Sequence, residues 1–317
     1  MNELAIAADL GGTHVRAAII DCGGKIHQRV KQKTPKSDNA DDIVKVLVAF
    51  SNEFLDSQEK KPFKAMSVVV PGTVHVDSGK VVKAPNLPCL DGFSLAAALE
   101  TELKLPVLIE NDANAAGVGE MWQGSAKGVK SIVCVTLGTG VGGGIILDGK
   151  LWRGIDGSAA EIGHIGVEPF GPPCGCGSHG CLEVFSSATA IVRMTRELGP
   201  DYSSSALNDL RELTAETVYR RGLAGDELAL EVFRRAGFYL GVGLASTINV
   251  LNPEVIVIGG GVAAGWGLFI NHVNEQITKR AFPEAARRAK VVRAICGDDA
   301  GLLGAAYLAF TTESLSG

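Results

Sequence analysis

The sequence has no apolar run that is long enough to cross a membrane as a helix. Glycine and threonine interrupt the uncharged stretches at residues 131–147 and 255–271, whereas a membrane-spanning helix needs about 20 apolar residues. The opening residues, MNELAIAADL, lack the basic segment that precedes the apolar part of a secretory signal. We therefore expect a soluble, cytoplasmic protein that does not enter a membrane.

An excess of basic residues is also missing. The chain carries 30 Lys and Arg against 35 Asp and Glu, for a formal net charge of -5. Binding to a phosphate backbone requires a broad positive surface. We therefore expect no nucleic acid among the partners.

The even set of cysteines that marks a secreted disulfide protein is absent as well. Seven cysteines are an odd number, and three of them lie within the segment PCGCGSHGC. The clustering favours metal binding in a reducing compartment.

The apolar content and the glycines define the organisation of the chain. Its 317 residues, 46% of them apolar, suffice for a sizeable core and favour two domains. Its 40 glycines gather in short bursts after apolar runs, which is typical of tight turns. In the first half, strands at 4–8 and 15–20 flank the turn DLGGT, and in the second half strands at 131–137 and 145–147 flank GTGVGGG. A hairpin turn into a third strand follows each pair.

The remaining periodic segments complete two α/β halves. Continuous apolar runs predict buried parallel strands at 65–70 and 254–258. Helical patterns occur at 41–55, 94–103, 113–122, 188–198, 206–221 and 226–249. We interpret the whole as a duplication, with one copy of the plan at the head of each domain.

The most specific signal is the segment EIGHIGVEPFGPPCGCGSHGCLE. It offers one imidazole and three thiolates, a closed set for tetrahedral zinc. The predicted ligands are His164, Cys174, Cys176 and Cys181. His179 is a competing ligand, but His164 already completes the coordination shell. Because no position stays open for a substrate, we predict a structural zinc.

Two glycine-rich turns have the composition of phosphate-binding loops. In DLGGTHVRAAII, Gly11 and Gly12 let the backbone approach an anion, and Thr13 adds a hydroxyl donor. Asp9 is placed to serve magnesium, directly or through water. A Gly-Gly turn in a hairpin is by itself more often purely structural. The second loop, TLGTGVGGGII, occupies the equivalent point of the other half and contributes Gly138, Thr139 and Gly140.

A nucleoside triphosphate gripped from both sides explains the two loops together. The sequence contains neither GxxxxGKS nor GxxxxGKT, so the loops are not P-loops. A third burst, VIVIGGGVAAG, follows a predicted strand, and on its own it is a simple strand-to-helix turn.

The segment LPVLIENDANAAGVGE places Asn111 and Asp112 between a predicted strand and an alanine-rich helix. An Asp or Asn at such a junction can cap the helix. The carboxyl end of a strand is equally a place for a general base that takes a proton from an attacking hydroxyl. The residues alone leave both interpretations of Asp112 open.

Five segments resemble, in order, the motifs of one family. DLGGTHVRAAI, ENDANAA, TLGTGVGGGI, GSAAEIGHIGV and CGCGSHGCLE are similar to the phosphate, catalytic, second phosphate, sugar-binding and zinc motifs of the ROK family (repressor, open reading frame, kinase). The resemblance extends through GGGVA and GDDAGLLGAA to about residue 306. The segment GTGVGGGIILDGKLWRG is most similar to the glucokinases of the family.

The resemblance implies the two-domain actin-like or hexokinase superfold, a ribonuclease H-like α/β fold with duplicated strand-hairpin-helix halves and an interdomain cleft. We expect a smaller N-terminal domain at residues 1–112, joined by a C-terminal helix at about 298–317. The larger α/β domain, with the zinc motif, is expected at 113–297. We also expect a homodimer or homotetramer.

For function, the resemblance implies phosphorylation of glucose at its 6-hydroxyl by magnesium ATP, with Asp112 as general base. The implied sugar-binding residues are Gly72, Asn86, Asn111, Asp112, Glu161, His164 and Glu183. The adenosine is implied to lie at Gly260 and Gly261 of the third glycine burst. One ring nitrogen of His164 would bind zinc while the other reaches a sugar hydroxyl.

Two other functions remain open at this level. One is an N-acetylglucosamine or N-acetylmannosamine kinase, because many glucokinases of the family carry a tryptophan after the Asn-Leu pair and APNLPCLDGF has none. The other is a non-catalytic sugar sensor, which would be expected to lose Asp112 or the loops. Repressors of the family carry a helix-turn-helix segment before the first phosphate motif, which here begins at residue 9, so we expect an enzyme. The phosphoryl donor stays open among ATP, other nucleotides and polyphosphate.

Overall fold

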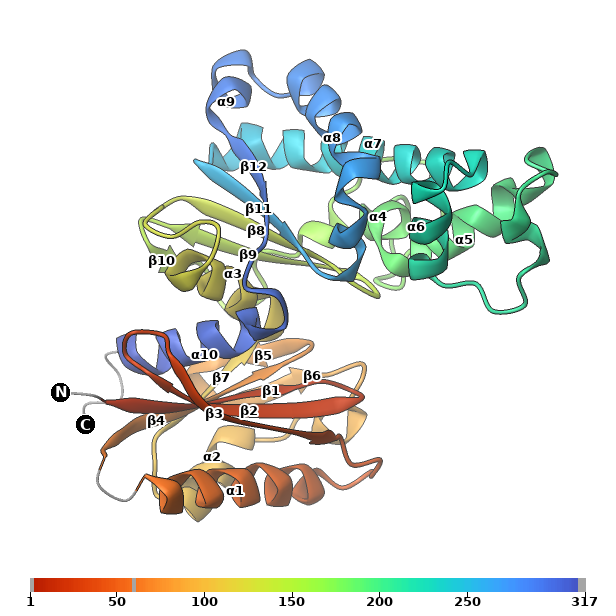
Figure 1. Cartoon of the computed structure of the whole chain (residues 1–317). Helices are drawn as coiled ribbons and strands as arrows, with labels where there is room; N and C mark the ends of the chain where they lie inside the picture. The colour runs from red at the N-terminus through yellow and green to blue at the C-terminus, as the bar shows by residue number, and fades with distance from the viewer. Residues whose placement is uncertain (1–2, 59–60, 313–317) are drawn as a thin grey trace. The chain divides into compact units, whose positions relative to one another are not determined.

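The computed structural model describes residues 3–58 and 61–312 and divides into two compact α/β units (Figure 1). The first unit comprises the described parts of residues 1–130, 144–160 and 296–317, and the second comprises 131–143 and 161–295.

The first unit is a five-stranded sheet with helices on both faces. The strand order is β3-β2-β1-β4-β7, with antiparallel pairing among β1, β2 and β3 and parallel pairing of β4 with β1 and β7. The strands are β1 (Leu4–Leu10), β2 (His14–Asp21), β3 (Ile26–Lys33), β4 (Phe63–Val70) and β7 (Val107–Asn111), with a separate pair formed by β5 (Thr73–His75) and β6 (Lys80–Lys83). The helices are α1 (Ala40–Ser57), α2 (Leu95–Leu103), α3 (Asp112–Gln123) and α10 (Ala300–Thr311), with short 3-10 helices η1 (Val76–Ser78), η2 (Pro88–Leu90) and η7 (Gly297–Asp299).

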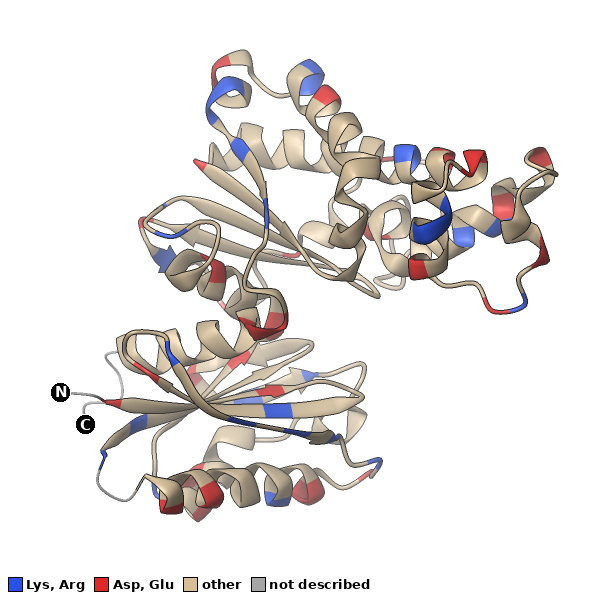
Figure 2. Ribbon diagram, in the orientation of Figure 1, with Lys and Arg blue, Asp and Glu red and all other residues tan. Residues whose placement is uncertain are grey.

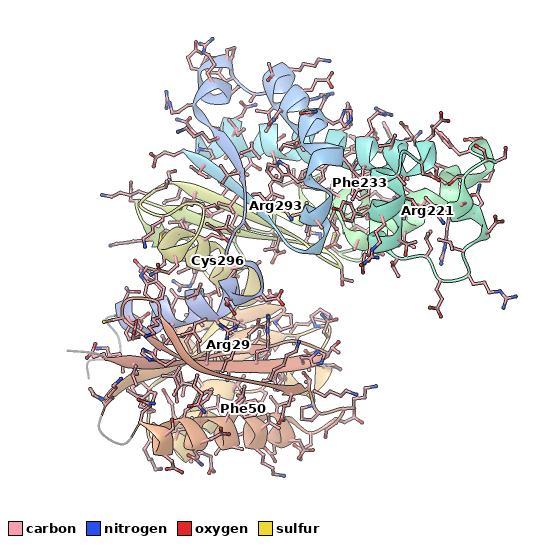
Figure 3. All side chains as sticks on the ribbon, in the orientation of Figure 1. Arg29, Phe50, Arg221, Phe233, Arg293 and Cys296 are labelled. Carbon is pink, nitrogen blue, oxygen red and sulfur yellow. The ribbon has the colours of Figure 1, made fainter. Side chains whose placement is uncertain are left out.

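The central strand β1 is buried on both faces, which explains its nearly continuous apolar sequence. Ile6 belongs to the core cluster that includes Phe50 of α1, a residue labelled in Figure 3. Ala7, which points the other way, belongs to the cluster that includes Ala305 of α10. Small side chains on this second face let α10 pack close to the sheet.

Helices α3 and α10 approach each other so closely that only glycine fits at two contacts. A Cβ on Gly119 would lie 2.1 Å from the carbonyl oxygen of Ala300, and one on Gly304 would lie 1.8 Å from that of Ala115. This contact joins α3 to the first unit.

The observed units therefore differ from the expected domain ranges. Residues 113–130 and 144–160 pack with the first unit, whereas the sequence-based boundary placed them in the larger domain. Sequence periodicity could not reveal the α3–α10 contact, because its two helices are separated by most of the chain.

The second five-stranded sheet has the order β10-β9-β8-β11-β12, with β11 parallel to β8 and β12 and β10 antiparallel to β9. The strands are β8 (Ile132–Leu137), β9 (Val141–Leu147), β10 (Lys150–Leu151), β11 (Val255–Gly259) and β12 (Lys290–Arg293). The helices are α4 (Glu183–Ser186), α5 (Ala188–Leu198), α6 (Ala215–Leu223), α7 (Glu227–Leu251), α8 (Trp266–Arg280) and α9 (Pro283–Arg288), with 3-10 helices η3 (Ile162–His164), η4 (Gly199–Asp201), η5 (Ala206–Asp209) and η6 (Gly261–Gly265). When the strands of each sheet are numbered in chain order, both sheets have the strand order third, second, first, fourth, fifth. The two sheets therefore share one topology, as the predicted duplication requires.

Two predicted elements were wrong in detail. The helix expected at 206–221 is interrupted: η5 ends at Asp209, and α6 begins only at Ala215, after the hydroxyl of Thr214 caps it by accepting from the amide of Thr217. The loop expected from Gly138 is shorter than GTGVGGG, because β9 already begins at Val141.

The second unit has its own core around the helix pair α7 and α8. Phe233 of α7, labelled in Figure 3, is 1% exposed and lies where a Cβ on Gly265 would approach within 2.7 Å of its ring. Basic and acidic residues are interspersed along both units (Figure 2). Across residues 3–58 and 61–312, no helix has both the length and the apolar character that crossing a membrane requires.

Candidate active site and metal centre

The first glycine-rich turn closes the hairpin between β1 and β2. The amide of Gly11 donates to the carbonyl of His14 at 3.0 Å, and the hydroxyl of Thr34 donates to the carbonyl of Gly11 at 2.6 Å. A Cβ on Gly12 would lie 3.0 Å from the Cβ of Asn86. The predicted phosphate loop and the predicted sugar loop therefore touch within the first unit, and glycine is what permits the contact.

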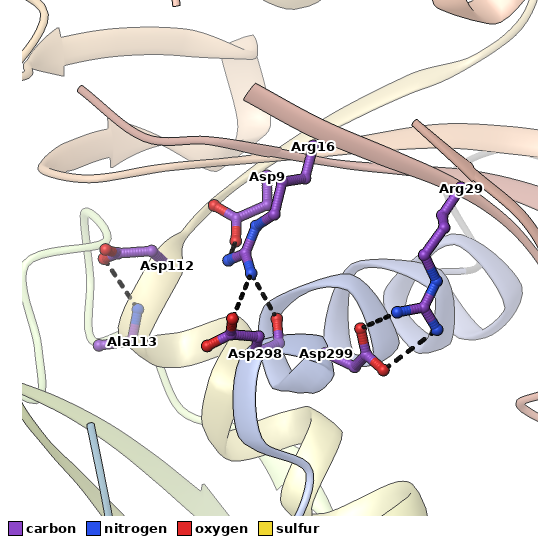
Figure 4. A network of polar contacts seen from close by, with 7 residues as sticks. All are labelled: Asp9, Arg16, Arg29, Asp112, Ala113, Asp298 and Asp299. Carbon is purple, nitrogen blue, oxygen red and sulfur yellow. Dashed lines mark hydrogen bonds and ion pairs between the residues drawn. The ribbon is translucent and has the colours of Figure 1, made fainter. Parts of the chain in front are cut away.

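Asp9 ends up in an ion pair that sequence reasoning did not identify. Arg16 lies opposite Asp9 in the β1–β2 register and pairs with its carboxylate. The same guanidinium donates to the carbonyl oxygen of Asp298 at 2.9 Å, and Arg29 of β3 reaches Asp299 at 3.2 Å (Figure 4). A two-residue turn after DLG puts residue 16 across from residue 9, so the hairpin register was the signal that could have identified Arg16.

The junction of β7 and α3 separates the roles of Asn111 and Asp112. Asn111 is the N-cap: its Oδ1 accepts from the amides of Ala113 at 2.9 Å and Asn114 at 3.0 Å. Asp112 is the first helical residue, and its Oδ1 accepts from the amide of Ala113 at 2.9 Å (Figure 4). The cap of α3 is thus supplied by the side-chain oxygen of Asn111.

Gly72 supports this junction through its backbone. Its φ is +135°, and a Cβ would lie 2.1 Å from the carbonyl oxygen of Lys83. Its own carbonyl accepts a hydrogen bond from the Nδ2 of Asn111 at 2.9 Å. Gly72 therefore orients Asn111, whose second amide hydrogen stays available to another acceptor.

An ion pair with a buried carboxylate lies next to the same junction. Glu110, whose side chain is 2% exposed, accepts from Arg153 Nε at 2.7 Å. Sequence reasoning missed the pair, since 43 residues separate its members and nothing in either segment marks them as partners.

The second glycine-rich loop, Gly138 to Gly140, belongs to the second unit and connects β8 to β9. The amide of Gly138 donates to the carbonyl of Gly140 at 2.9 Å, and the hydroxyl of Thr189 donates to the carbonyl of Thr139 at 2.8 Å. The amide of Val141 donates to Glu183 Oε2 at 3.0 Å. The loop is therefore held next to the predicted sugar ligand Glu183.

A cavity of about 550 Å³ opens beside Thr139 and is lined by residues of α5 and the start of α6, including Arg193 and Arg196. Gly260 and Gly261 are not in its lining. Gly260 has a φ of +85°, and a Cβ there would lie 2.4 Å from the carbonyl oxygen of Leu137, so this glycine is required by packing against β8. Gly261 has no heavy atom within 4 Å of a Cβ position.

The four predicted metal ligands converge. The ligand atoms of His164, Cys174, Cys176 and Cys181 all lie within 4.8 Å of one another. The Nδ1 of His164 is 3.6 Å from the sulfur of Cys174, and the sulfurs of Cys176 and Cys181 are 3.7 Å apart. Tetrahedral zinc with bonds of about 2.3 Å to sulfur and about 2.0 Å to nitrogen requires edges of about 3.8 and about 3.6 Å, so the donor set fits zinc. His179 is not part of this cluster.

The thiols themselves need a cation to become thiolates together. Burial raises the pKa of the Cys174 thiol and raises that of Cys181 to about 12. At the exposed Cys176, a hydrogen bond from the amide of Ser178 lowers the pKa. Three adjacent negative charges at these positions are stable only beside a positive ion, which is the condition that a bound metal meets.

Glu161 and Glu183 flank the cysteine cluster. With Nδ1 of His164 directed to Cys174, its Nε2 lies 3.8 Å from Glu161 Oε2, and Glu183 Oε1 lies 4.0 Å from the sulfur of Cys174. One imidazole therefore joins the cluster to a group of carboxylates suited to a polyol.

The predicted site residues fall into one set in each unit. The first unit carries Asp9, Gly11, Gly12, Thr13, Gly72, Asn86, Asn111 and Asp112. The second carries Gly138, Thr139, Gly140, Glu161, His164, Cys174, Cys176, Cys181, Glu183, Gly260 and Gly261.

Comparison with known proteins agrees with the motifs. The model of the ROK family matches residues 5–312. A glucokinase from Halalkalibacterium halodurans is 37% identical over 316 residues, which cover 98% of this chain and 96% of the relative. The chain belongs to the ROK family.

Solved members of the family share the fold. A ROK hexokinase from Thermus thermophilus aligns with a TM-score of 0.83 and 31% identity over 97% of this chain and 98% of its own. A ROK family glucokinase from Streptomyces griseus, solved in complex with glucose and AMPPNP, aligns with a TM-score of 0.80 and 34% identity over 98% of this chain and 100% of its own. The predicted actin-like or hexokinase fold is thereby confirmed.

Proposed function

We propose that this chain is an ATP-dependent glucokinase, which transfers the γ-phosphoryl group of magnesium ATP to the 6-hydroxyl of glucose. The observation that carries the proposal is similarity over nearly the full length to glucokinases, one of them solved with glucose and a nucleotide analogue. The proposed base Asp112 and the two proposed phosphate turns follow β7, β1 and β8, respectively, which supports the proposal.

Asp112 is the general base of the proposed reaction. It takes the proton from the 6-hydroxyl as that oxygen attacks the γ-phosphorus. The cap contributed by Asn111 supports this role, because the capping function alone does not require a carboxylate at position 112. Phosphoryl transfer otherwise depends on positioning and on stabilisation of charge.

The sugar hydroxyls are bound, in this proposal, by Glu161, His164 and Glu183 together with Asn111. The orientation of His164 supports it, since Nδ1 faces the cysteines and Nε2 is left for a hydroxyl. Gly72 acts through Asn111, and Asn86 lies next to the first phosphate loop.

Magnesium ATP is the second substrate. Its phosphates are proposed to bind the turn Gly11 to Thr13 and the loop Gly138 to Gly140, with Asp9 serving the magnesium ion. The cavity beside Thr139 provides volume for the nucleoside. Gly260 and Gly261, which follow β11, are also proposed to contact the nucleotide.

We further propose that the cysteine cluster holds structural zinc. When bound, zinc would stabilise the segment as a cross-link and neutralise the thiolates. His164, Cys174, Cys176 and Cys181 would be its ligands. A zinc ion bound at Nδ1 would fix the tautomer of the His164 ring and the orientation of its Nε2 toward the sugar.

An N-acetylhexosamine is the competing substrate, and one observation favours it. A cavity of about 350 Å³ in the first unit is lined by Gly12, Asn86 and Cys89, at the segment where the tryptophan of many glucokinases is missing. A substituent on the sugar would find space there. Against it, Glu161, His164 and Glu183 would leave a polar group unpaired where an acetamide replaces a hydroxyl.

Initial rates with purified protein test the proposal. Glucose, mannose, N-acetylglucosamine and N-acetylmannosamine are compared with ATP, and glucose is then compared with ATP and polyphosphate as donors. We expect glucose to exceed both N-acetyl sugars by at least about tenfold in kcat/KM, equal to about 1.4 kcal/mol in transition-state binding. Faster turnover of either N-acetyl sugar at limiting concentration would replace the glucokinase assignment, and no turnover of any hexose would remove the kinase assignment.

A further inference from the structure

The buried carboxylate of Glu110 holds the backbone and side chains on both sides of Asp112. Its Oε1 accepts from the amide of Asn111 at 2.9 Å and from Nδ2 of Asn114 at 3.0 Å. Its Oε2 accepts from Arg153 Nε at 2.7 Å. Because Asp112 lies between Asn111 and Asn114, a shift of Glu110 would move the start of α3 and the carboxylate on it.

Arg153 is itself anchored. It follows β10, and its carbonyl accepts from the amide of Ala159 at 3.2 Å, which closes the loop 153–159. Within that loop, a Cβ on Gly157 would lie 2.5 Å from the carbonyl oxygen of Val74, so the loop is pressed against β5. The backbone of Arg153 is therefore fixed, and its guanidinium can hold Glu110 in one position.

Glu110 depends on Arg153 because its carboxylate is buried. Glu110 is 2% exposed and the side chain of Arg153 is 29% exposed, so loss of the guanidinium would leave a buried carboxylate without its charged partner. Asn114 is 3% exposed, and its Oδ1 accepts no hydrogen bond although it is buried. Asn114 therefore depends on Glu110 for its orientation as well.

We propose that Glu110 and Arg153 are positioning residues for phosphoryl transfer: Arg153 fixes Glu110, and Glu110 fixes Asn111, Asn114 and hence the base Asp112. This inference rests on the proposed kinase function. Neither residue touches the reacting atoms in this scheme, so their loss should affect turnover more than the binding of magnesium ATP at the separate glycine-rich turn.

The test compares the steady-state kinetics of folded variants at a temperature well below their unfolding midpoints. Arg153→Met should lower kcat by about 10²-fold, the scale on which small misplacements of a catalytic group act, while KM for magnesium ATP changes less than about twofold. Glu110→Gln should lower kcat in the same direction. The double variant with Glu110→Gln and Arg153→Met buries no unpaired charge, so its kcat should lie above that of Arg153→Met alone. Arg287→Met breaks the exposed pair with Glu284 and is the matched control, with kcat unchanged.

Arg153→Lys keeps the charge without the planar Nε donor, and it decides the question if Arg153→Met does not fold. We expect at least about a threefold loss of kcat in Arg153→Lys. Folded Arg153 variants that keep wild-type kcat, with only a lower unfolding midpoint, would overturn the inference and leave the pair with a structural role. If the wild-type protein phosphorylates no hexose, the proposed function fails instead, and the two failures are therefore distinguishable.

Discussion

Replacing Cys176 with serine tests the contribution of the proposed zinc to this fold. Cys174 and Cys181 are buried, whereas Cys176 is exposed, so Cys176→Ser removes one ligand with little loss of packing. Cys22 is also exposed and lies outside the cluster. Cys22→Ser is therefore the matched control for the thiol-to-hydroxyl change.

The expected magnitude follows from the four-ligand geometry. Structural zinc in small sites contributes about 10–16 kcal/mol at pH 7. If four ligands share this free energy equally, one ligand accounts for about 3 kcal/mol, or roughly a 10²-fold loss of affinity. Without zinc, His164 loses the partner that orients its ring, and Glu183 next to Cys174 faces a rearranged segment. Zinc content, the unfolding midpoint and glucokinase turnover should therefore fall together.

Elemental analysis, thermal unfolding and the coupled kinase assay measure these three quantities on the same preparation. We expect about one zinc per chain in the wild type and in Cys22→Ser, and a clear deficit in Cys176→Ser. A wild-type protein purified under reducing conditions that carries no zinc and is fully active would refute the reasoning. So would a Cys176→Ser variant that loses zinc but keeps its stability and its turnover.

Three further outcomes are expected. Asp112→Asn should bind glucose nearly normally but lose about 10² to 10⁴ in turnover, and a variant with more than half of the wild-type turnover would contradict its role as base. Asp9→Ala should raise KM for magnesium ATP with little change in glucose affinity, measured by varying each substrate separately; a loss confined to the sugar would exclude the magnesium role. A hydrogen bond from Arg234 lowers the pKa of Glu231 to about 2 against an ordinary value of 4.5, so Glu231 contributes stability above about pH 4.5 that is lost as the pH falls toward 2. Arg234 and Arg235, which both pair with Glu231, are about half exposed. Glu231→Gln should therefore lower the free energy of unfolding, measured in urea at pH 7, by only about 1 kcal/mol, and the difference from wild type should vanish near pH 2.

Local sequence was sufficient for most features that depend on neighbours in the chain. The strands at 4–8 and 65–70 were predictable because both faces of β1 and most of β4 are buried, which requires unbroken apolar runs. The cysteine cluster was predictable because three of its ligands fall within eight residues, a spacing that few alternatives explain. The prediction of one helix at 206–221 was wrong, although the missed signal was also local. Thr214 caps a new helix, and a count of apolar periodicity does not detect a cap.

Only the tertiary structure decided the contacts between distant segments. That Asn111 and not Asp112 caps α3 depends on the backbone angles at the end of β7, where Gly72 orients the amide. The Glu110–Arg153 pair, and the glycine contacts that join α3 to α10 and so set the unit boundary, connect positions far apart in the chain. Sequence periodicity reports which side of an element is buried, but the partner that buries it is set by packing. For this protein the family and the reaction class were therefore predictable from motifs, whereas the contacts between distant segments became visible only in the fold.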